Sequence, residues 1–168
     1  MQELLRVILS KAASVALLVA GALFVQNAGA EKIWNWIYRG GNIVASGTFT
    51  TSENVDSLGF YQITRIAGHR NGDPIKGLHP AGSVIPGNEP HTLDNLIRVD
   101  TQGQITAHGF GFVTASGNYA NTFYSDSHET PGYIEVFTTV STFSELPVTF
   151  VATPVSEPEI NVELPAGQ

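Results

Sequence analysis

The feature that most constrains the fold is a period of two in the side chains of residues 94–124. From Ile105 onward one face would carry Ile105, Ala107, Gly109, Gly111 and Val113, and the other Thr106, His108, Phe110, Phe112 and Thr114. Alternation over this length is typical of a β-strand. Turn residues stand at both ends, Thr101-Gln102-Gly103 and Ser116-Gly117-Asn118. The stretch therefore predicts two or three antiparallel strands joined by tight turns.

Two glycines on the central strand, Gly109 and Gly111, leave part of one face without side chains beside two phenylalanines. Glycine inside a strand often marks a place where another backbone or a ring approaches closely. We expect such a close contact at these positions.

The remaining chain repeats short alternating segments separated by turns. Trp34, Trp36 and Tyr38 share one face of a first strand, and Gly40-Gly41-Asn42 would turn the chain into a second. Asn71-Gly72 is the strongest short-range hairpin signal in the sequence. Near the end, residues 133–140 alternate, and residues 143–153 would point Val148, Phe150 and Ala152 inward.

These patterns predict an all-β fold, an antiparallel meander of about eight to ten strands that closes as a β-sandwich or a small β-barrel. The polar segments Thr51–Gly59 and Ser125–Gly132 are expected to be loops. The domain would span residues 31–154. Residues 155–168 are rich in proline and glutamate and hold no aromatic residue, so we expect a disordered tail there.

Residues 1–30 have the order of a secretory signal peptide. Arg6 and Lys11 precede the apolar run 12–25, and Ala28-Gly29-Ala30 follows as a small-x-small cleavage site. The alternative is a membrane anchor, but this run of 14 residues falls short of the roughly 20 that cross a bilayer. We expect cleavage of a signal helix, secretion to the periplasm or the medium, and no stable membrane anchor afterwards.

The charge and cysteine content narrow the classes of partner. Without residues 1–30 the chain would keep 138 residues, 6 of them basic and 14 acidic. Nucleic acid is disfavoured as a partner because phosphates require a dense basic patch. Docking on an anionic membrane surface is disfavoured for the same reason. The sequence has no cysteine, so the domain has to fold without disulfides even in an oxidising compartment.

A long segment without strand periodicity, residues 79–94, is the first candidate for a binding edge. It holds three prolines, which donate no hydrogen bond to a sheet, and irregular loops of this length are often functional. His79, His91 and Asp94 lie in this segment. Zinc sites need three or four ligands at short spacings, so we predict no metal here. Asp94-Asn95 is better explained as an anchor ahead of the Leu96-Ile97 strand.

Four aromatic residues on predicted strands have two interpretations. Trp34, Trp36, Phe110 and Phe112 could line a pocket for a small apolar ligand or a sugar. The alternative, which we favour, is that they form part of the hydrophobic core.

Enzymatic chemistry has weak support in the sequence. His108 on the central strand, or the pair His91 and Asp94, could act as a general base if a carboxylate and a nucleophile stood close. However, the chain has no G-x-S-x-G, H-E-x-x-H or phosphate-binding glycine motif. Asp56, Asp73 and Glu135 are scattered rather than paired as in glycosidases. We assign no catalytic residue and expect no cofactor.

Two further charged groups have ordinary explanations. Asp126, His128 and Glu129 make an oxygen-rich segment, but the calcium-loop pattern is absent and a solvated turn is expected. Arg65, Arg70 and Arg98 could form a small basic patch for carboxylates or sulfated sugars, although separate surface ion pairs are favoured in so acidic a chain.

Seven short motifs follow one another along the chain: ASGTFTT (45–51), GFYQIT (59–64), RNG (70–72), IPGNEP (85–90), DNLI (94–97), GFGF (109–112) and ELPV (145–148). In this order they resemble a group of exported cyanobacterial β-proteins without an assigned activity, many of which carry a C-terminal PEP-CTERM sorting signal. The similarity covers nearly all of residues 34–153 and implies a shared fold and export, with no active site to carry over. Ser156-Glu157-Pro158 stands where the sorting signal would begin, but no apolar helix or basic cluster follows. A released form is therefore expected.

Together these features predict an exported, noncatalytic all-β domain that serves as a structural or adhesive component of the cell envelope or extracellular matrix. Its partners would be glycans or envelope proteins, contacted through the 79–94 segment and exposed aromatic residues. The alternatives are a β-barrel carrier of a small apolar ligand held among the four aromatic residues and, third, an enzyme that uses His108 or the His91 and Asp94 pair.

Overall fold

The computed structural model describes residues 31–100, 102–127 and 131–156. The expected signal peptide and most of the expected tail lie outside the described residues. Within them the chain forms nine strands and no helix, and so has no helix that could span a membrane. The strands are β1 (Lys32–Gly40), β2 (Ile43–Val55), β3 (Phe60–Arg70), β4 (Asp73–Leu78), β5 (Leu96–Arg98), β6 (Phe110–Thr114), β7 (Tyr119–Ser125), β8 (Gly132–Thr138) and β9 (Phe143–Pro154).

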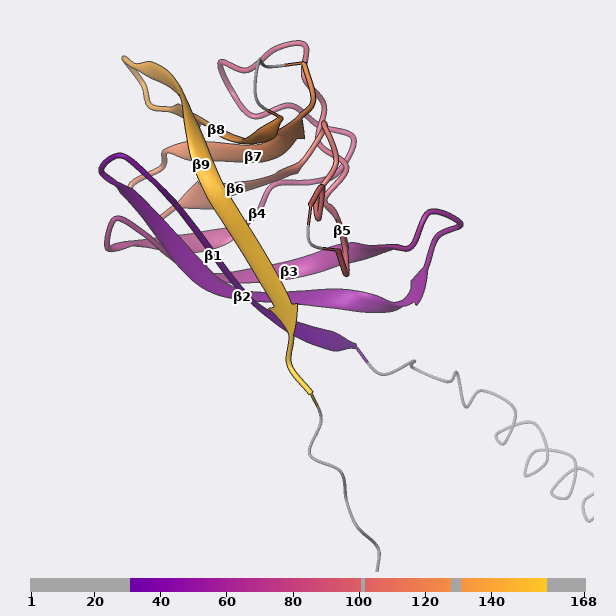
Figure 1. Ribbon diagram of the computed structural model, residues 1–168. Helices are drawn as coiled ribbons and strands as arrows, with labels where there is room; N and C mark the ends of the chain where they lie inside the picture. Colours follow the sequence, from indigo (N-terminus) through magenta and orange to yellow (C-terminus); the bar gives the residue numbers. More distant parts are fainter. Residues whose placement is uncertain (1–30, 101, 128–130, 157–168) are drawn as a thin grey trace, which may run out of the picture.

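Eight of these strands close into an antiparallel barrel (Figure 1). The neighbours run β2-β1-β9-β8-β7-β6-β4-β3, and a β2–β3 ladder completes the ring. Strand β5 pairs with β3 beyond the end of this order. The predicted all-β meander is confirmed, and of the two predicted closures the barrel is the one that forms.

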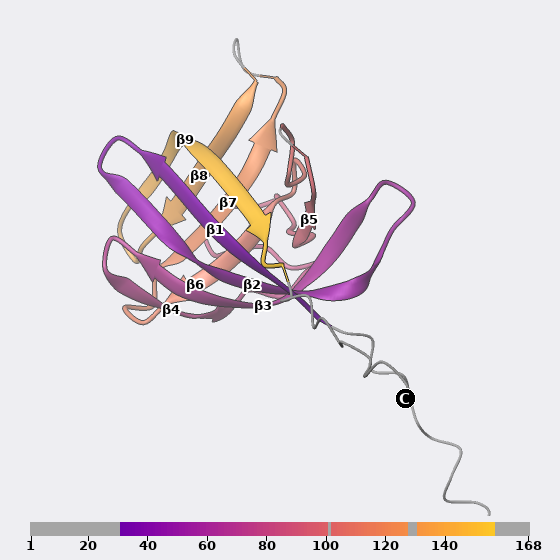
Figure 2. The ribbon, with the colours of Figure 1, turned by 60° about the horizontal axis from the view of Figure 1, so that its bottom comes forward.

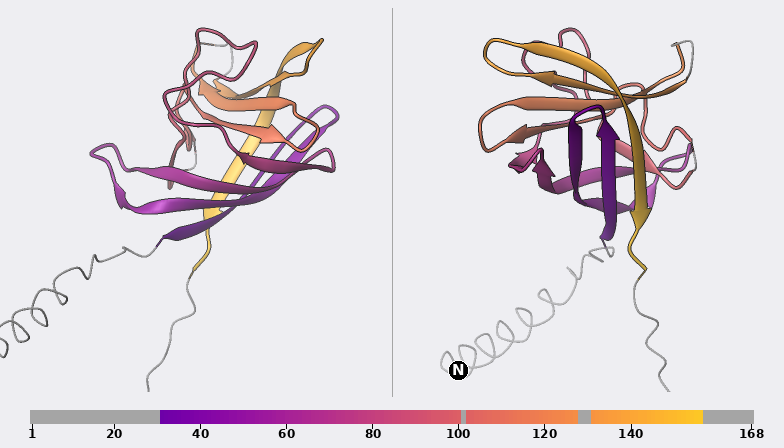
Figure 3. Two further views of the ribbon diagram at one scale, coloured as in Figure 1. Left: turned by 180° about the vertical axis from the view of Figure 1, so that it is seen from behind. Right: turned by 60° about the vertical axis from the view of Figure 1, so that its left-hand side comes forward.

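Consecutive strands run in opposite directions, so the two ends of the barrel differ. One end, here called the turn end, carries the short connections β1–β2, β3–β4, β6–β7 and β8–β9. The other, the loop end, carries the β2–β3 and β7–β8 connections, the connection from β4 toward β6, and both ends of the described chain. There the backbone N–H of Val155 donates to the carbonyl oxygen of Ile33 at 2.7 Å. The chain accordingly enters and leaves the barrel side by side (Figures 2 and 3).

The predicted hairpin turns at Gly40-Gly41-Asn42 and Asn71-Gly72 form between β1 and β2 and between β3 and β4. Asn71 and Gly72 adopt positive φ values of 48° and 82°, which suit the two-residue turn between β3 and β4. The Asn71 side chain also accepts a hydrogen bond from the backbone N–H of Val44 at 2.8 Å. This bond links the β3–β4 turn to β2 next to the β1–β2 turn.

Two predicted boundaries are wrong. Strand β2 continues to Val55, so most of the segment 51–59 is strand rather than loop. In the central stretch, β6 begins at Phe110 and not at Ile105, which makes only an isolated bridge with Ile97. The reason lies in Thr106, whose hydroxyl accepts hydrogen bonds from the N–H groups of His108 and Gly109. These local bonds form a turn that competes with strand pairing.

Large aromatic side chains fill the centre of the barrel. The Trp36 ring lies 5.2 Å from Phe49 and 5.9 Å from Phe110, and Phe49 lies 4.9 Å from Phe110, all between ring centroids. Val148, Phe150 and Ala152 point inward from β9, as predicted. Aromatic pairs at these separations are in contact, so they supply much of the core packing.

The segment between β4 and β5, residues 79–95, forms a cover over the outer face of β6, β7 and β8. Its Ile85 and Leu93 pack with Val136 of β8. The hydroxyl of Thr138 donates to the carbonyl oxygen of Pro86 at 2.7 Å. We call this segment the cover loop. It contains no strand, in agreement with the prediction from its prolines.

The close contacts expected at Gly109 and Gly111 are confirmed. A Cβ atom at Gly109 would lie 2.1 Å from the carbonyl oxygen of Thr122. At Gly111 it would lie 2.4 Å from a methyl carbon of Leu93. Gly111 therefore makes room for the cover loop.

Candidate functional site

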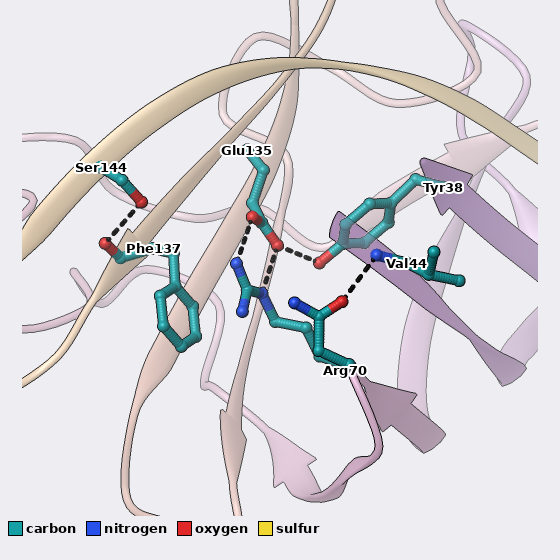
Figure 4. A network of polar contacts seen from close by, with 7 residues as sticks. Tyr38, Val44, Arg70, Glu135, Phe137 and Ser144 are labelled. Atoms are coloured by element: carbon teal, nitrogen blue, oxygen red, sulfur yellow. Dashed lines mark hydrogen bonds and ion pairs between the residues drawn. The ribbon is translucent and has the colours of Figure 1, made fainter. Parts of the chain in front are cut away.

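The most distinctive polar arrangement of the described chain lies inside the barrel toward the turn end. The guanidinium of Arg70 donates two hydrogen bonds to the carboxylate of Glu135, at 2.8 Å from Nε and 2.7 Å from Nη2. The hydroxyl of Tyr38 donates a third to the same carboxylate (Figure 4). We call Tyr38, Arg70 and Glu135 the polar cluster.

Three strands that are far apart in sequence supply these side chains. Tyr38 follows Trp34 and Trp36 on the inward face of β1, and Arg70 is the last residue of β3. Glu135 stands between Tyr133 and Phe137 on β8, so the period of two turns its carboxylate toward the interior. The guanidinium carbon of Arg70 also lies 3.5 Å from the centre of the Phe137 ring, a cation–π contact.

Burial dominates the electrostatics of the polar cluster. The side chain of Glu135 is 0% exposed and that of Arg70 is 10% exposed. Burial, followed by the negative charge of Glu135, raises the pKa of Tyr38 well above its usual value. Burial alone would lower the pKa of Arg70, but the hydrogen bonds and charge of Glu135 outweigh it and raise that pKa. The cluster therefore holds a neutral phenol beside an ion pair.

The chemistry open to the polar cluster is limited by its enclosure. The Oε1 atom of Glu135 accepts hydrogen bonds from the Tyr38 hydroxyl and from Nε of Arg70. Its Oε2 atom accepts one from Nη2 of Arg70. A general base or a nucleophile needs access to a substrate atom within hydrogen-bonding distance. A fully buried carboxylate with all of these contacts is instead suited to joining β1, β3 and β8 across the interior.

The three cover-loop residues singled out in the sequence, His79, His91 and Asp94, have separate surroundings. His79 contacts the carbonyl oxygen of Val84 through Nε2 at 3.0 Å, and its ring packs edge-on against Tyr119. His91 is exposed. No group of three or more histidine, aspartate or glutamate side chains within residues 31–100, 102–127 and 131–156 is placed to hold a metal ion.

Asp94 anchors the cover loop to the turn before β6. Its Oδ2 accepts a hydrogen bond from the hydroxyl of Thr106 at 2.6 Å, and its Oδ1 accepts from the N–H of Leu96 at 3.3 Å. Burial raises the pKa of this carboxyl, although the hydrogen bond from Thr106 opposes the shift. The neighbouring Asn95 bridges the carbonyl oxygen of His79 and the N–H of Gly111. The predicted anchoring role of Asp94-Asn95 is thus confirmed.

His108 is not on the central strand, where the sequence pattern placed it. It lies in the turn formed around Thr106, and its side chain is exposed. Its Nδ1 contacts the carbonyl oxygen of Thr92 at 2.9 Å. The partner of this ring nitrogen is therefore a backbone carbonyl rather than the carboxylate that a catalytic triad requires.

The four aromatic candidates lie in the core and contact other core residues. Trp34, Trp36, Phe110 and Phe112 are at most 2% exposed. The indole N–H of Trp34 donates to the hydroxyl of Thr51 at 3.1 Å, which satisfies its polar atom within the barrel. Trp36 and Phe110 are neighbours in the aromatic packing described above.

The three arginines do not form a common basic patch. Arg65 pairs with Glu31 and Arg98 with Asp100 at the surface, while Arg70 pairs with Glu135 inside the barrel. Separate ion pairs were expected, but the burial of the third was not. In the acidic segment Asp126 is exposed, and His128 and Glu129 lie outside the described residues.

Sequence reasoning missed the polar cluster because its members are far apart along the chain. Tyr38 and Arg70 are separated by 32 positions, and Arg70 and Glu135 by 65. One signal was available. Glu135 shares a strand face with Tyr133 and Phe137, and an acid between two inward aromatic residues needs a buried partner.

Comparisons with known proteins add no relative. No family model, no curated protein and no solved structure matches this chain.

Proposed function

We propose that the protein is an exported, noncatalytic β-barrel module that acts as a structural or adhesive component of the cell envelope or extracellular matrix. The observation that carries this proposal is the occupation of the barrel interior by the chain's own side chains. Aromatic rings fill its centre and the polar cluster stands toward the turn end. Contacts with other molecules would then be made by the outer surface.

A carrier would require a different interior. Pockets for small ligands are typically about 300–1,000 Å³ in volume and are lined by separated apolar groups. Here Trp36, Phe49 and Phe110 are mutually in contact, with centroids 4.9–5.9 Å apart. A ligand at this position would have to displace at least one of these rings.

Export is supported by the sequence. The N-terminal residues follow the order of a signal peptide, and the motifs between residues 34 and 153 resemble exported cyanobacterial proteins. The barrel is also suited to an oxidising compartment, because it contains no cysteine and is held by packing and buried polar contacts.

The outer surface offers an apolar contact element at the tip of the β8–β9 hairpin. Val140 is fully exposed and Phe143 is 56% exposed. The tip is the orange-to-yellow hairpin at the upper left of Figure 1. It belongs to the turn end, away from the end at which the described chain begins and finishes. A glycan or an envelope protein could pack against an exposed ring and aliphatic side chain of this kind.

The experiment follows the location and retention of the protein in the producing cells. Wild type, a Val140→Ser/Phe143→Ser variant and a Val99→Ser control would be compared in cytoplasmic, envelope, matrix and medium fractions. We expect wild type and Val99→Ser in the envelope or matrix fraction, and a shift of the tip variant to the medium. Retention in the cytoplasm with residues 1–30 still attached would contradict export, and equal retention of all three proteins would contradict contact through this tip.

A second measurement separates the proposal from the carrier alternative. The purified protein would be titrated with a fatty acid and with an apolar dye while tryptophan fluorescence is recorded. Because Trp34 and Trp36 are buried among other rings, we expect no saturable change. A saturable change at one ligand per chain would favour a carrier.

A further inference from the structure

Two buried polar atoms inside the barrel have no hydrogen-bond partner within the part of the chain that the structure describes. They are the indole N–H of Trp36 and the hydroxyl oxygen of Thr122, and their residues are 2% and 0% exposed. Leaving a buried polar group unpaired costs free energy, so such groups in proteins are nearly always bonded to protein atoms or to ordered water. These two atoms therefore point to a partner other than the neighbouring side chains.

The other tryptophan on the inward face of β1 provides a contrast. The indole N–H of Trp34 donates to the hydroxyl of Thr51 at 3.1 Å. Trp36 is instead surrounded by aromatic rings. Tyr38 and Phe49 stack on it, with interplanar angles of 22° and 14°. An indole N–H lies in the plane of its ring, so a ring stacked on the indole face cannot accept its hydrogen bond.

The two unpaired atoms have neighbours in common. Trp36 contacts the rings of Tyr38 and Phe110, at 5.8 and 5.9 Å between centroids. Thr122 stands directly opposite Phe110 in the β6–β7 ladder and opposite Glu135 in the β7–β8 ladder. Its hydroxyl lies near enough to Tyr38 to lower the pKa of that phenol, although no hydrogen bond joins the two groups. Trp36 and Thr122 therefore border the same part of the interior, beside the polar cluster.

We propose that Trp36, Thr122 and Tyr38 bind one buried water molecule inside the barrel. The water accepts a hydrogen bond from the indole N–H of Trp36 and donates one to the hydroxyl oxygen of Thr122. It donates a second to the phenol oxygen of Tyr38, which keeps acceptor capacity while its own proton is bonded to Glu135. Buried waters in proteins typically make about three hydrogen bonds to groups that are otherwise unsatisfied. The proposal concerns the interior alone and does not depend on the proposed function.

The surroundings restrict the ligand to water. Trp36, Phe49 and Phe110 are mutually in contact, so a larger organic molecule would have to displace a ring. A bound ion would have to be removed from water without a counter-charge, because Arg70 and Glu135 already pair with each other. The rival explanation is an N–H···π contact of Trp36 with the edge-on ring of Phe110. That contact would leave the hydroxyl of Thr122 unpaired.

The first measurement is the nuclear Overhauser effect between water and the indole protons of the full chain, labelled with ¹⁵N. Trp34 and Trp36 are the two tryptophans of the sequence, so the spectrum holds two indole signals. Thr51→Val assigns them, because it removes the acceptor of Trp34 and shifts that signal. We expect a cross-peak from a long-lived water at the Trp36 indole proton. Its absence in wild type would overturn the proposal and favour the N–H···π contact.

The second measurement counts the long-lived internal waters by ¹⁷O magnetic relaxation dispersion in wild type, Thr122→Val and Thr51→Val. Valine keeps the branched shape of threonine and removes the hydroxyl. We expect one water fewer in Thr122→Val, with loss of the Trp36 cross-peak, and an unchanged number in the control Thr51→Val, whose hydroxyl already pairs with Trp34. Circular dichroism would establish that the variants keep the β fold. An unchanged count and cross-peak in folded Thr122→Val would overturn the proposal, and the wild-type cross-peak decides it if that variant does not fold.

Discussion

Arg70 and Glu135 form a two-point hydrogen-bonded ion pair inside the barrel, although 65 positions separate them in the sequence. The pair joins the end of β3 to the middle of β8, strands that are not neighbours in the sheet. Both charges are removed from water, so each depends on the other for its hydrogen bonds. The losses of stability caused by removing Arg70 and by removing Glu135 should therefore not be additive when both are removed.

We predict that Glu135→Gln and Arg70→Met each lower the free energy of unfolding by about 3–5 kcal/mol, because each leaves a buried polar group without its partner. The double variant should lose clearly less than the sum of the two. Urea denaturation followed by the fluorescence of the buried tryptophans measures these values. The control is the exposed pair Arg65 and Glu31, whose disruption should cost at most about 1 kcal/mol. Additive effects at Arg70 and Glu135 would contradict the coupling.

A second prediction concerns pH and Tyr38. Its pKa is raised in the folded protein by burial and then by Glu135, so the unfolded chain releases this proton at a lower pH. Its contribution to stability is complete below the unfolded pKa of about 10 and is lost as the pH rises above that value. Tyr38→Phe should cost about 1–3 kcal/mol at pH 7, because Glu135 loses a hydrogen bond.

The same variant should lose less relative to wild type as the pH rises above about 10, because phenylalanine does not titrate. Unfolding in urea at pH 7 and at several alkaline values tests this trend. The other tyrosines are present in both proteins, so their titration cancels in the comparison. A difference between wild type and variant that stays constant with pH would argue against a raised pKa for Tyr38.

A third prediction uses two glycines in neighbouring regions of the wall. A Cβ atom at Gly47 would lie 1.8 Å from the carbonyl oxygen of Ala67 in β3, and backbone cannot move aside cheaply. Gly47→Ala should therefore lower stability by several kcal/mol, about 3 or more. At Gly77 no atom lies within 4 Å of the added carbon, so Gly77→Ala should change stability by less than about 1 kcal/mol. Thermal denaturation of both variants measures the contrast, and equal melting temperatures would refute it.

A fourth prediction concerns Asn95, which holds the cover loop. Asn95 has a positive φ of 53° and is 1% exposed, and its side chain bridges His79 and Gly111. Asn95→Ala loses both hydrogen bonds and also disfavours the backbone conformation, so it should cost about 2–4 kcal/mol. Asn95→Gly keeps the backbone conformation accessible and should cost less, by about 1 kcal/mol.

Hydrogen exchange would locate the effect of these Asn95 variants. Amides of the cover loop, such as those of Gly82 and Leu93, should exchange faster in both variants, while amides of β1 and β9 keep their protection. Unchanged exchange at Gly82 and Leu93 would show that the cover loop is held by packing alone.

Much of the fold could be predicted from local patterns. The Asn71-Gly72 turn, the inward face of β1 and the strand-free cover loop all follow from side-chain alternation, positive-φ turn residues and proline. The start of β6 was placed five residues too early, at Ile105, because alternation alone ignores the hydroxyl of Thr106. A side chain that bonds to nearby N–H groups ends strand pairing even where the pattern continues.

The candidate site could be predicted only in part. The anchoring role of Asp94-Asn95 was expected because these residue types cap turns, a local property. His108 was placed on a strand and proved to lie in a turn, since the local hydrogen bonds of Thr106 were not considered. The pairing of Arg70 with Glu135 was missed because it depends on which strands face each other across the interior.

The sequence by itself determined the short strands, the turns between them and the side of each strand that faces inward, because these follow from the geometry of a few consecutive residues. Tertiary structure decided that the strands close into a barrel rather than two sheets, which wall the cover loop packs against, and which acid meets which base inside. Those outcomes depend on contacts between residues distant in sequence, and such contacts form only when the whole chain is packed.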